Sequence, residues 1–163
     1  AFRAAMTGHQ VYSTLHTSSA IGVLPRLLDI GVLPDVLSGN IIGMIAQRLV
    51  RTLCPFCKEQ YTPDEFEQRL LGMTAPQPLY RAIGCPKCEH QGYKGRTTVM
   101  ELLKIDGDLD ELIARRASLR EIRQMALSKG FRPIADDACR RVMAGETSLD
   151  EITRVVDLTD RVG

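Results

Sequence analysis

Two pairs of cysteines constrain this chain more than any other feature of its sequence. Cys54 and Cys57 form one C-x-x-C pair, and Cys85 and Cys88 form the second. A two-residue spacer lets both thiolates of a pair turn towards one metal ion, and two pairs complete the tetrahedron that Zn²⁺ prefers. We therefore predict a zinc site. We expect it to be structural, because four cysteine ligands leave no open position for catalysis.

Sequence alone leaves other uses of these cysteines open. A thioredoxin-like redox site needs only one pair and a βαβ setting, which this region lacks. Disulfides, an iron–sulfur cluster and four unrelated core thiols are further alternatives, and the spacing favours zinc over each of them. We interpret the fifth cysteine, Cys139, as a buried core thiol. Four basic residues near the pairs could offset the negative charge of a four-thiolate site: Arg51, Lys58, Lys87 and Arg96.

Composition and charge place the chain among ordinary globular proteins. Its 163 residues are 44% hydrophobic and 25% charged, and the net charge is +1. A balanced charge and few aromatic residues argue against a nucleic-acid partner. No stretch approaches the ~18 consecutive apolar residues of a membrane span. The chain begins without an initiator methionine, and we expect it to be part of a longer protein.

Apolar periodicity and turn residues predict a mixed α/β order before the first cysteine pair. The expected elements are a helix end at residues 1–6, a strand at 10–15, a helix through 21–28 kinked at Pro25, a helix at 34–45 and a strand at 48–53.

The second half of the chain is predicted to be mainly helical. A short helix at 64–71 lies between the cysteine pairs, and a strand at 93–105 follows them. Beyond Gly107 the expected elements are helices, with capping boxes formed by Ser118 with Glu121 and by Ser148 with Glu151.

Two histidines are candidates for function. His9 and His16 bracket the predicted strand at 10–15. Their chemistry alone allows phosphate contacts, metal ligation or a structural role, because imidazole suits all three.

Several motifs follow one another in a recognisable order along nearly the whole chain. They occupy residues 7–17, 26–31, 46–57, 84–88, 92–96, 101–103 and 145–151. In this order they resemble the type II secretion and type IV pilus assembly ATPases, and residues 7–17 are similar to the His box of that family.

The resemblance implies a fold and a site. It implies the C-terminal part of an α/β, RecA-like motor domain at residues 1–53, a tetracysteine zinc-binding module at 54–95, and a strand followed by a C-terminal helical segment at 96–163. His16 and His9 would be catalytic. Thr14 and His16 would contact the nucleotide, with His16 approaching the γ-phosphate.

The resemblance also implies a cellular role. The full-length protein would be a cytoplasmic homohexameric ATPase, using ATP and Mg²⁺ to power pseudopilus or pilus assembly. It would be peripheral to the inner membrane, with a platform protein and the cytoplasmic domain of a membrane anchor as partners. The branch among secretion, pili, DNA uptake and conjugation stays open.

The chain by itself is expected not to hydrolyse ATP, because no G-x-x-x-x-G-K-[ST] loop occurs in its sequence. The rival interpretation is a zinc-ribbon adaptor without catalysis. A nucleic-acid-binding zinc ribbon is a third, less favoured one.

Overall fold

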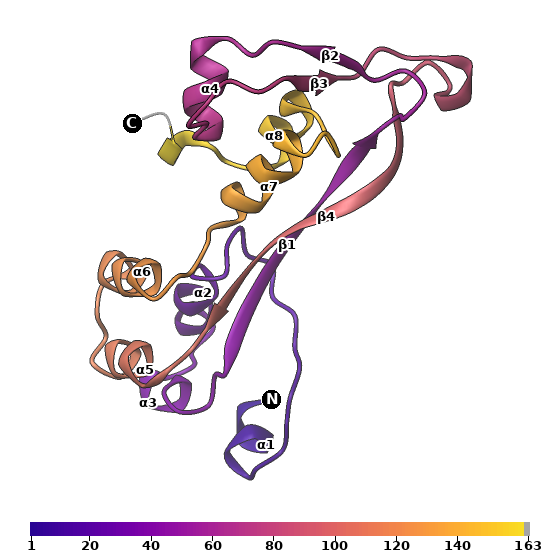
Figure 1. Cartoon of the computed structure of the whole chain (residues 1–163). Helices are drawn as coiled ribbons and strands as arrows, with labels where there is room; N and C mark the ends of the chain where they lie inside the picture. Colours follow the sequence, from indigo (N-terminus) through magenta and orange to yellow (C-terminus); the bar gives the residue numbers. More distant parts are fainter. Residues whose placement is uncertain (162–163) are drawn as a thin grey trace. The chain divides into compact units, whose positions relative to one another are not determined.

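Two long strands, β1 (Gly43–Leu53) and β4 (Tyr93–Lys104), pair with each other and contribute residues to both parts of the chain (Figure 1). The computed structural model describes residues 1–161. These residues form two units: unit 1 comprises residues 1–46 and 101–132, and unit 2 comprises 47–100 and 133 onward. The strands run in opposite directions, since Gly43 lies opposite Leu103 and Gly95 lies opposite Thr52. Of the predicted segment 96–163, the last two residues lie outside the described part.

Unit 1 consists of short helices around residues 43–46 of β1 and residues 101–104 of β4. Its helices are α1 (Phe2–Met6), α2 (Val23–Asp29), α3 (Pro34–Leu37), α5 (Gly107–Ala114) and α6 (Leu119–Ser128). α5 and α6 pack against each other, and apolar side chains of α2, α3, β1, β4, α5 and α6 share one core. The predicted capping box at the start of α6 is confirmed, because Ser118 and Glu121 each bind the other's backbone N–H.

The predicted strand at residues 10–15 is wrong. These residues have no regular secondary structure, and the side chain of Tyr12 is 84% exposed. A strand needs a neighbour to satisfy its backbone groups. No strand in the described part of the chain pairs with this segment.

The predicted helix at residues 34–45 is also wrong beyond its first turn. α3 ends at Leu37, Gly39 follows with a φ of +72°, and β1 begins at Gly43. Burial then alternates: Met44 is buried, whereas Ile45 is 62% exposed. The side chains in this region therefore alternate between buried and exposed, as in a strand, and do not follow the 3.6-residue repeat of a helix.

Pro25 does not kink a helix as predicted. α2 begins at Val23, so Pro25 lies in its first turn. The backbone N–H that proline lacks would have no partner inside the helix at this position.

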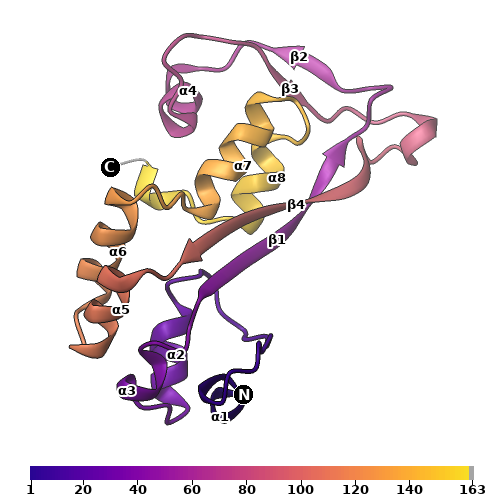
Figure 2. The ribbon, with the colours of Figure 1, turned by 60° about the horizontal axis from the view of Figure 1, so that its bottom comes forward.

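Unit 2 contains residues 47–53 of β1 and residues 93–100 of β4. Its other elements are β2 (Glu59–Tyr61), α4 (Glu65–Leu71), β3 (Leu79–Arg81), η1 (Pro86–Cys88), α7 (Ile134–Met143), α8 (Leu149–Val155) and η2 (Thr159–Arg161). β2 and β3 pair antiparallel, with Gln60 opposite Tyr80. α7 and α8 lie side by side (Figure 2). Cys139 is buried in α7, as predicted.

Residues 145–151, which we call the docking turn, bind the end of β1. The Leu53 N–H donates to the carbonyl oxygen of Glu146 at 2.9 Å. The Thr147 hydroxyl donates to the carbonyl oxygen of Arg51 at 2.8 Å. Since Thr147 is fully buried, these bonds are shielded from competing water. The docking turn therefore holds the strand that leads into the first cysteine pair.

Glu151 completes this attachment with a buried carboxylate. Its side chain has no exposed surface. It accepts hydrogen bonds from the Arg51 guanidinium at 2.6 Å and from Arg154 at 2.8 Å. Burial opposes its ionisation, but these guanidinium bonds prevail and lower the pKa of Glu151 to about 2. The predicted capping box is half formed, because the Ser148 hydroxyl caps α8 while the Glu151 carboxylate binds Arg51.

Replacing the buried carboxylate tests this attachment. We expect Glu151→Gln to lower the free energy of unfolding of this chain by about 2–3 kcal/mol, the usual value of hydrogen bonds to charged groups. Asp150→Asn, an exposed neighbour in the same helix, is the matched control and should change it by less than about 0.5 kcal/mol. Chemical denaturation at pH 7 measures both. Equal effects of the two substitutions would contradict the account.

The stability difference between the wild type and Glu151→Gln should also depend on pH. The pKa of Glu151 is lower in the folded state, so its stabilisation is complete above its unfolded pKa of about 4.3. It is lost as pH falls from there towards about 2. The stability difference between the wild type and Glu151→Gln should therefore shrink several-fold between pH 6 and pH 2.5. A difference that stays constant over this range would refute the assignment.

Candidate functional site

Four thiols meet where β1 ends and β4 begins. Cys54 directly follows β1, and Cys88 ends η1 shortly before β4. All four Sγ atoms lie within 4.8 Å of one another. The separations are 4.0 Å for Cys54–Cys85, 3.8 Å for Cys57–Cys88 and 3.8 Å for Cys85–Cys88. The structure thus brings together all four predicted metal ligands.

The spacing of the sulfur atoms fits a tetrahedral metal ion. Four sulfurs at about 2.3 Å from a central Zn²⁺ are separated by about 3.8 Å along each edge of the tetrahedron. The three separations of 3.8–4.0 Å are close to this edge. They are far longer than the ~2.05 Å of a disulfide bond, and all five cysteines of the chain are free. The four cysteines therefore form a group that can hold a metal ion.

Backbone N–H groups point at the sulfur atoms. The N–H groups of Cys85 and Gly92 each donate to Cys88 Sγ at 3.2 Å, and that of Gly84 donates to Cys57 Sγ at 3.4 Å. Burial opposes the ionisation of Cys88, but the two backbone donors prevail and lower the pKa of its thiol to about 6. Burial raises the pKa of Cys57 to about 11. Because the thiolate is the form that binds a metal ion, these backbone donors favour metal binding at the cluster.

Two glycines shape the second cysteine pair. Gly84 has a φ of +119°, and a Cβ there would lie 2.6 Å from the carbonyl oxygen of His90. Gly92 has a φ of +77°, and its Cβ would lie 2.6 Å from the Cβ of Ala82. Only glycine fits both the backbone conformation and the space. The sequence marks both positions as glycine but gives no sign that the chain approaches itself here.

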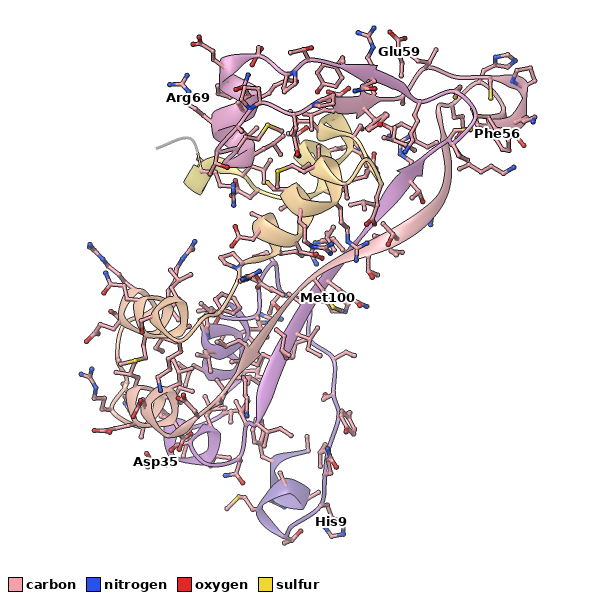
Figure 3. All side chains as sticks on the ribbon, viewed as in Figure 1. His9, Asp35, Phe56, Glu59, Arg69 and Met100 are labelled. Atoms are coloured by element: carbon pink, nitrogen blue, oxygen red, sulfur yellow. The ribbon has the colours of Figure 1, made fainter. Side chains whose placement is uncertain are left out.

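Some basic residues expected to offset the charge of the cluster have other contacts. Arg51 binds Glu151, and Lys58 donates to the Gly145 carbonyl at 2.8 Å. The ammonium of Lys87 lies 3.9 Å from the ring centre of Phe56. Phe56 is 58% exposed and lies between Cys54 and Cys57 in the sequence (Figure 3). The cluster therefore carries an exposed aromatic ring beside a cation.

The histidine candidates lie in an exposed segment of unit 1. The Thr7 hydroxyl lies 3.1 Å from His9 Nδ1, which fixes that ring close to the end of α1 (Figure 3). Thr14 and His16 are exposed. Within the described residues, no hydrogen bond joins His9, Thr14 and His16. Their catalytic and nucleotide-binding roles stay predictions.

None of the helices in the described part of the chain is both long enough and apolar enough to span a membrane.

Comparison with known proteins matches nearly the whole chain to one family. The family model described as type II/IV secretion system protein matches residues 1–154. The type II secretion system ATPase E of Vibrio cholerae is 47% identical over 95% of this chain and 31% of its own length. The type II secretion system protein E of Pseudomonas aeruginosa is also 47% identical, over 95% of this chain and 31% of its own length.

Pilus proteins match as well. The type IV pilus assembly ATPase TfpB of Acinetobacter baylyi is 39% identical over 98% of this chain and 28% of its own length. The chain thus spans about a third of the length of these relatives. The matches confirm the resemblance seen in the motifs. The chain belongs to the type II/IV secretion system protein family.

Proposed function

We propose that this chain is the C-terminal part of an ATPase that powers pseudopilus or pilus assembly. The observation that carries the proposal is a family match over residues 1–154 that includes the complete four-thiol cluster. Relatives named as secretion and pilus ATPases match 93% or more of this chain. The full-length protein is proposed to act as a homohexamer on the cytoplasmic face of the inner membrane.

We propose further that unit 1 belongs to a RecA-like motor domain. Residues 10–15 have the composition of a strand, yet they lie exposed, and no strand within residues 1–161 pairs with them. Ile42, Ile45 and Leu102 are also exposed in this unit. An unpaired strand-like segment and exposed large apolar side chains suit a surface that other strands cover. In this proposal, the remainder of the motor domain supplies that cover.

The metal of the four-thiol cluster is proposed to be structural zinc. Cys54, Cys57, Cys85 and Cys88 would hold it, with Gly84 and Gly92 allowing the tight backbone around it. Bound zinc would fix the sulfur positions and supply folding free energy to the surrounding module. The exposed ring of Phe56 beside Lys87 supports a protein-facing role for this module. The inner-membrane platform protein and the membrane anchor are the proposed partners.

His16 is proposed to act in ATP hydrolysis with Mg²⁺ in the full-length protein. An exposed imidazole can donate to a phosphate oxygen as negative charge develops there. In the same proposal, His9 and Thr14 shape the phosphate side of the site. The exposure of His16 and Thr14 supports access to a ligand.

The zinc proposal predicts about one zinc ion per chain in protein purified without added metal, as measured by elemental analysis. Cys88→Ser should abolish this content and raise amide exchange across residues 54–95, while α5 and α6 stay protected. Cys139→Ala, which removes a thiol outside the cluster, is the control and should retain the zinc. A metal content near zero with four reactive thiols would overturn the proposal.

The His16 proposal predicts a loss of turnover without a loss of stability. In the full-length ATPase, His16→Ala should lower kcat about 10²-fold, the usual cost of removing one charge-stabilising donor. Its melting temperature should stay unchanged. His90→Ala, another exposed histidine, is the control and should keep full activity. Normal turnover with a lowered melting temperature would make His16 structural.

The chain alone is expected neither to bind Mg·ATP with a micromolar Kd nor to hydrolyse it. Its sequence contains no phosphate-binding G-x-x-x-x-G-K-[ST] loop to hold the β- and γ-phosphates. Calorimetric titration and phosphate release measure the two properties. A micromolar Kd for this chain would show that another phosphate site exists within it.

A further inference from the structure

Unit 1 contains a buried carboxylate that the proposed function does not use. Glu101 on β4 is only 4% exposed, and its neighbours on the same face of the strand, Val99 and Leu103, are buried apolar residues. Within the described part of unit 1, Glu101 is the one charged side chain that is buried. Burying a carboxylate is costly unless it is hydrogen-bonded. An apolar residue would continue the pattern of this strand at no such cost.

One partner of this carboxylate lies 81 positions earlier in the chain. The backbone N–H of Ala20 donates to Glu101 Oε1 at 2.5 Å. Ala20 has no exposed surface and packs in the core of unit 1 with Leu24 of α2. A hydrogen bond in such a place is shielded from competing water. Glu101 therefore fixes the backbone at Ala20.

Ala20 is the point at which the exposed segment that carries His9 and His16 enters the core of unit 1. The exposed residues 9–16 precede it. α2 begins three residues after Ala20, where the Val23 N–H donates to the Ala20 carbonyl at 3.1 Å. His16 lies only four residues before Ala20. An anchor at Ala20 therefore limits how far the backbone that carries His16 can move.

We propose that Glu101 is a positioning residue for His16. Its buried hydrogen bond holds the backbone of Ala20 in the core. This limits the positions that the backbone at His16, four residues earlier, can take. This inference rests on the proposed role of His16 in hydrolysis. A small displacement of a group that stabilises developing charge lowers turnover steeply, while ground-state binding is largely kept.

Hydrogen exchange on this chain tests the anchor by itself. We expect the Ala20 amide to exchange about 10²-fold faster in Glu101→Leu, which has no acceptor. Glu101→Gln retains a carbonyl acceptor and should increase the rate by less than about tenfold. Leu102→Gln, at the exposed neighbouring position of β4, is the control and should leave the rate unchanged. Should Glu101→Leu fail to fold, Glu101→Met gives the same comparison.

Steady-state kinetics of the full-length ATPase tests the positioning. Glu101→Leu should lower kcat about tenfold and leave the KM for ATP within about twofold, with Glu101→Gln restoring most of the loss. Because Glu101 acts through His16, Glu101→Leu should cause little further loss in a His16→Ala background.

The outcomes separate the two claims. An unchanged Ala20 exchange rate in both Glu101→Leu and Glu101→Met overturns the anchor. Equal losses of kcat in the presence and absence of His16 show a purely structural Glu101 and overturn the positioning role. Normal turnover of His16→Ala overturns the proposed role of His16, and the positioning role with it, while exchange at Ala20 still decides whether the anchor exists.

Discussion

The convergence of four thiols at one point determines how the two long strands are joined. Cys54 follows β1 directly, and its N–H donates at 2.9 Å to the carbonyl oxygen of Gly92, the residue before β4. Between these points the chain makes β2, α4, β3 and η1 before it returns. Ordering so long a connection costs conformational entropy. The proposed zinc would offset this cost by holding both ends of the connection together.

The docking turn, residues 145–151, connects the strand ends at the cysteine cluster to the C-terminal helices. Glu146 and Thr147 bind the backbone of β1, and Glu151 binds the side chain of Arg51 on that strand. The hydroxyl of Tyr93 lies 2.6 Å from that of Ser148, so the start of β4 is attached as well. These contacts give the motif at 145–151 a physical role. Through these contacts, α8 is attached to the end of β1 and the start of β4, beside the four thiols.

Local signals predicted much of this fold. The cysteine pairs, the strand at 93–105, the helix at 64–71 and the cap at Ser118 depend on residues close in sequence, and the structure has each of them. Two of the wrong predictions depend on distant residues. Pairing with β4 makes residues 43–45 a strand, and residues 10–15 stay irregular because no strand among residues 1–161 pairs with them. The hydrogen bond between Glu101 and Ala20 spans 81 positions and has no local signature. The cysteine site was therefore predictable, whereas the backbone contacts that support each site were not.

We propose that the four thiols hold one zinc ion as a closed site. X-ray absorption at the zinc edge, measured on zinc-loaded protein, tests it most directly because it reports the type, number and distance of the ligands. For a closed four-cysteine site we expect four sulfur atoms at about 2.3 Å from the zinc and no nitrogen or oxygen ligand. A shell that contains a nitrogen or oxygen ligand, or fewer than four sulfurs, would contradict it.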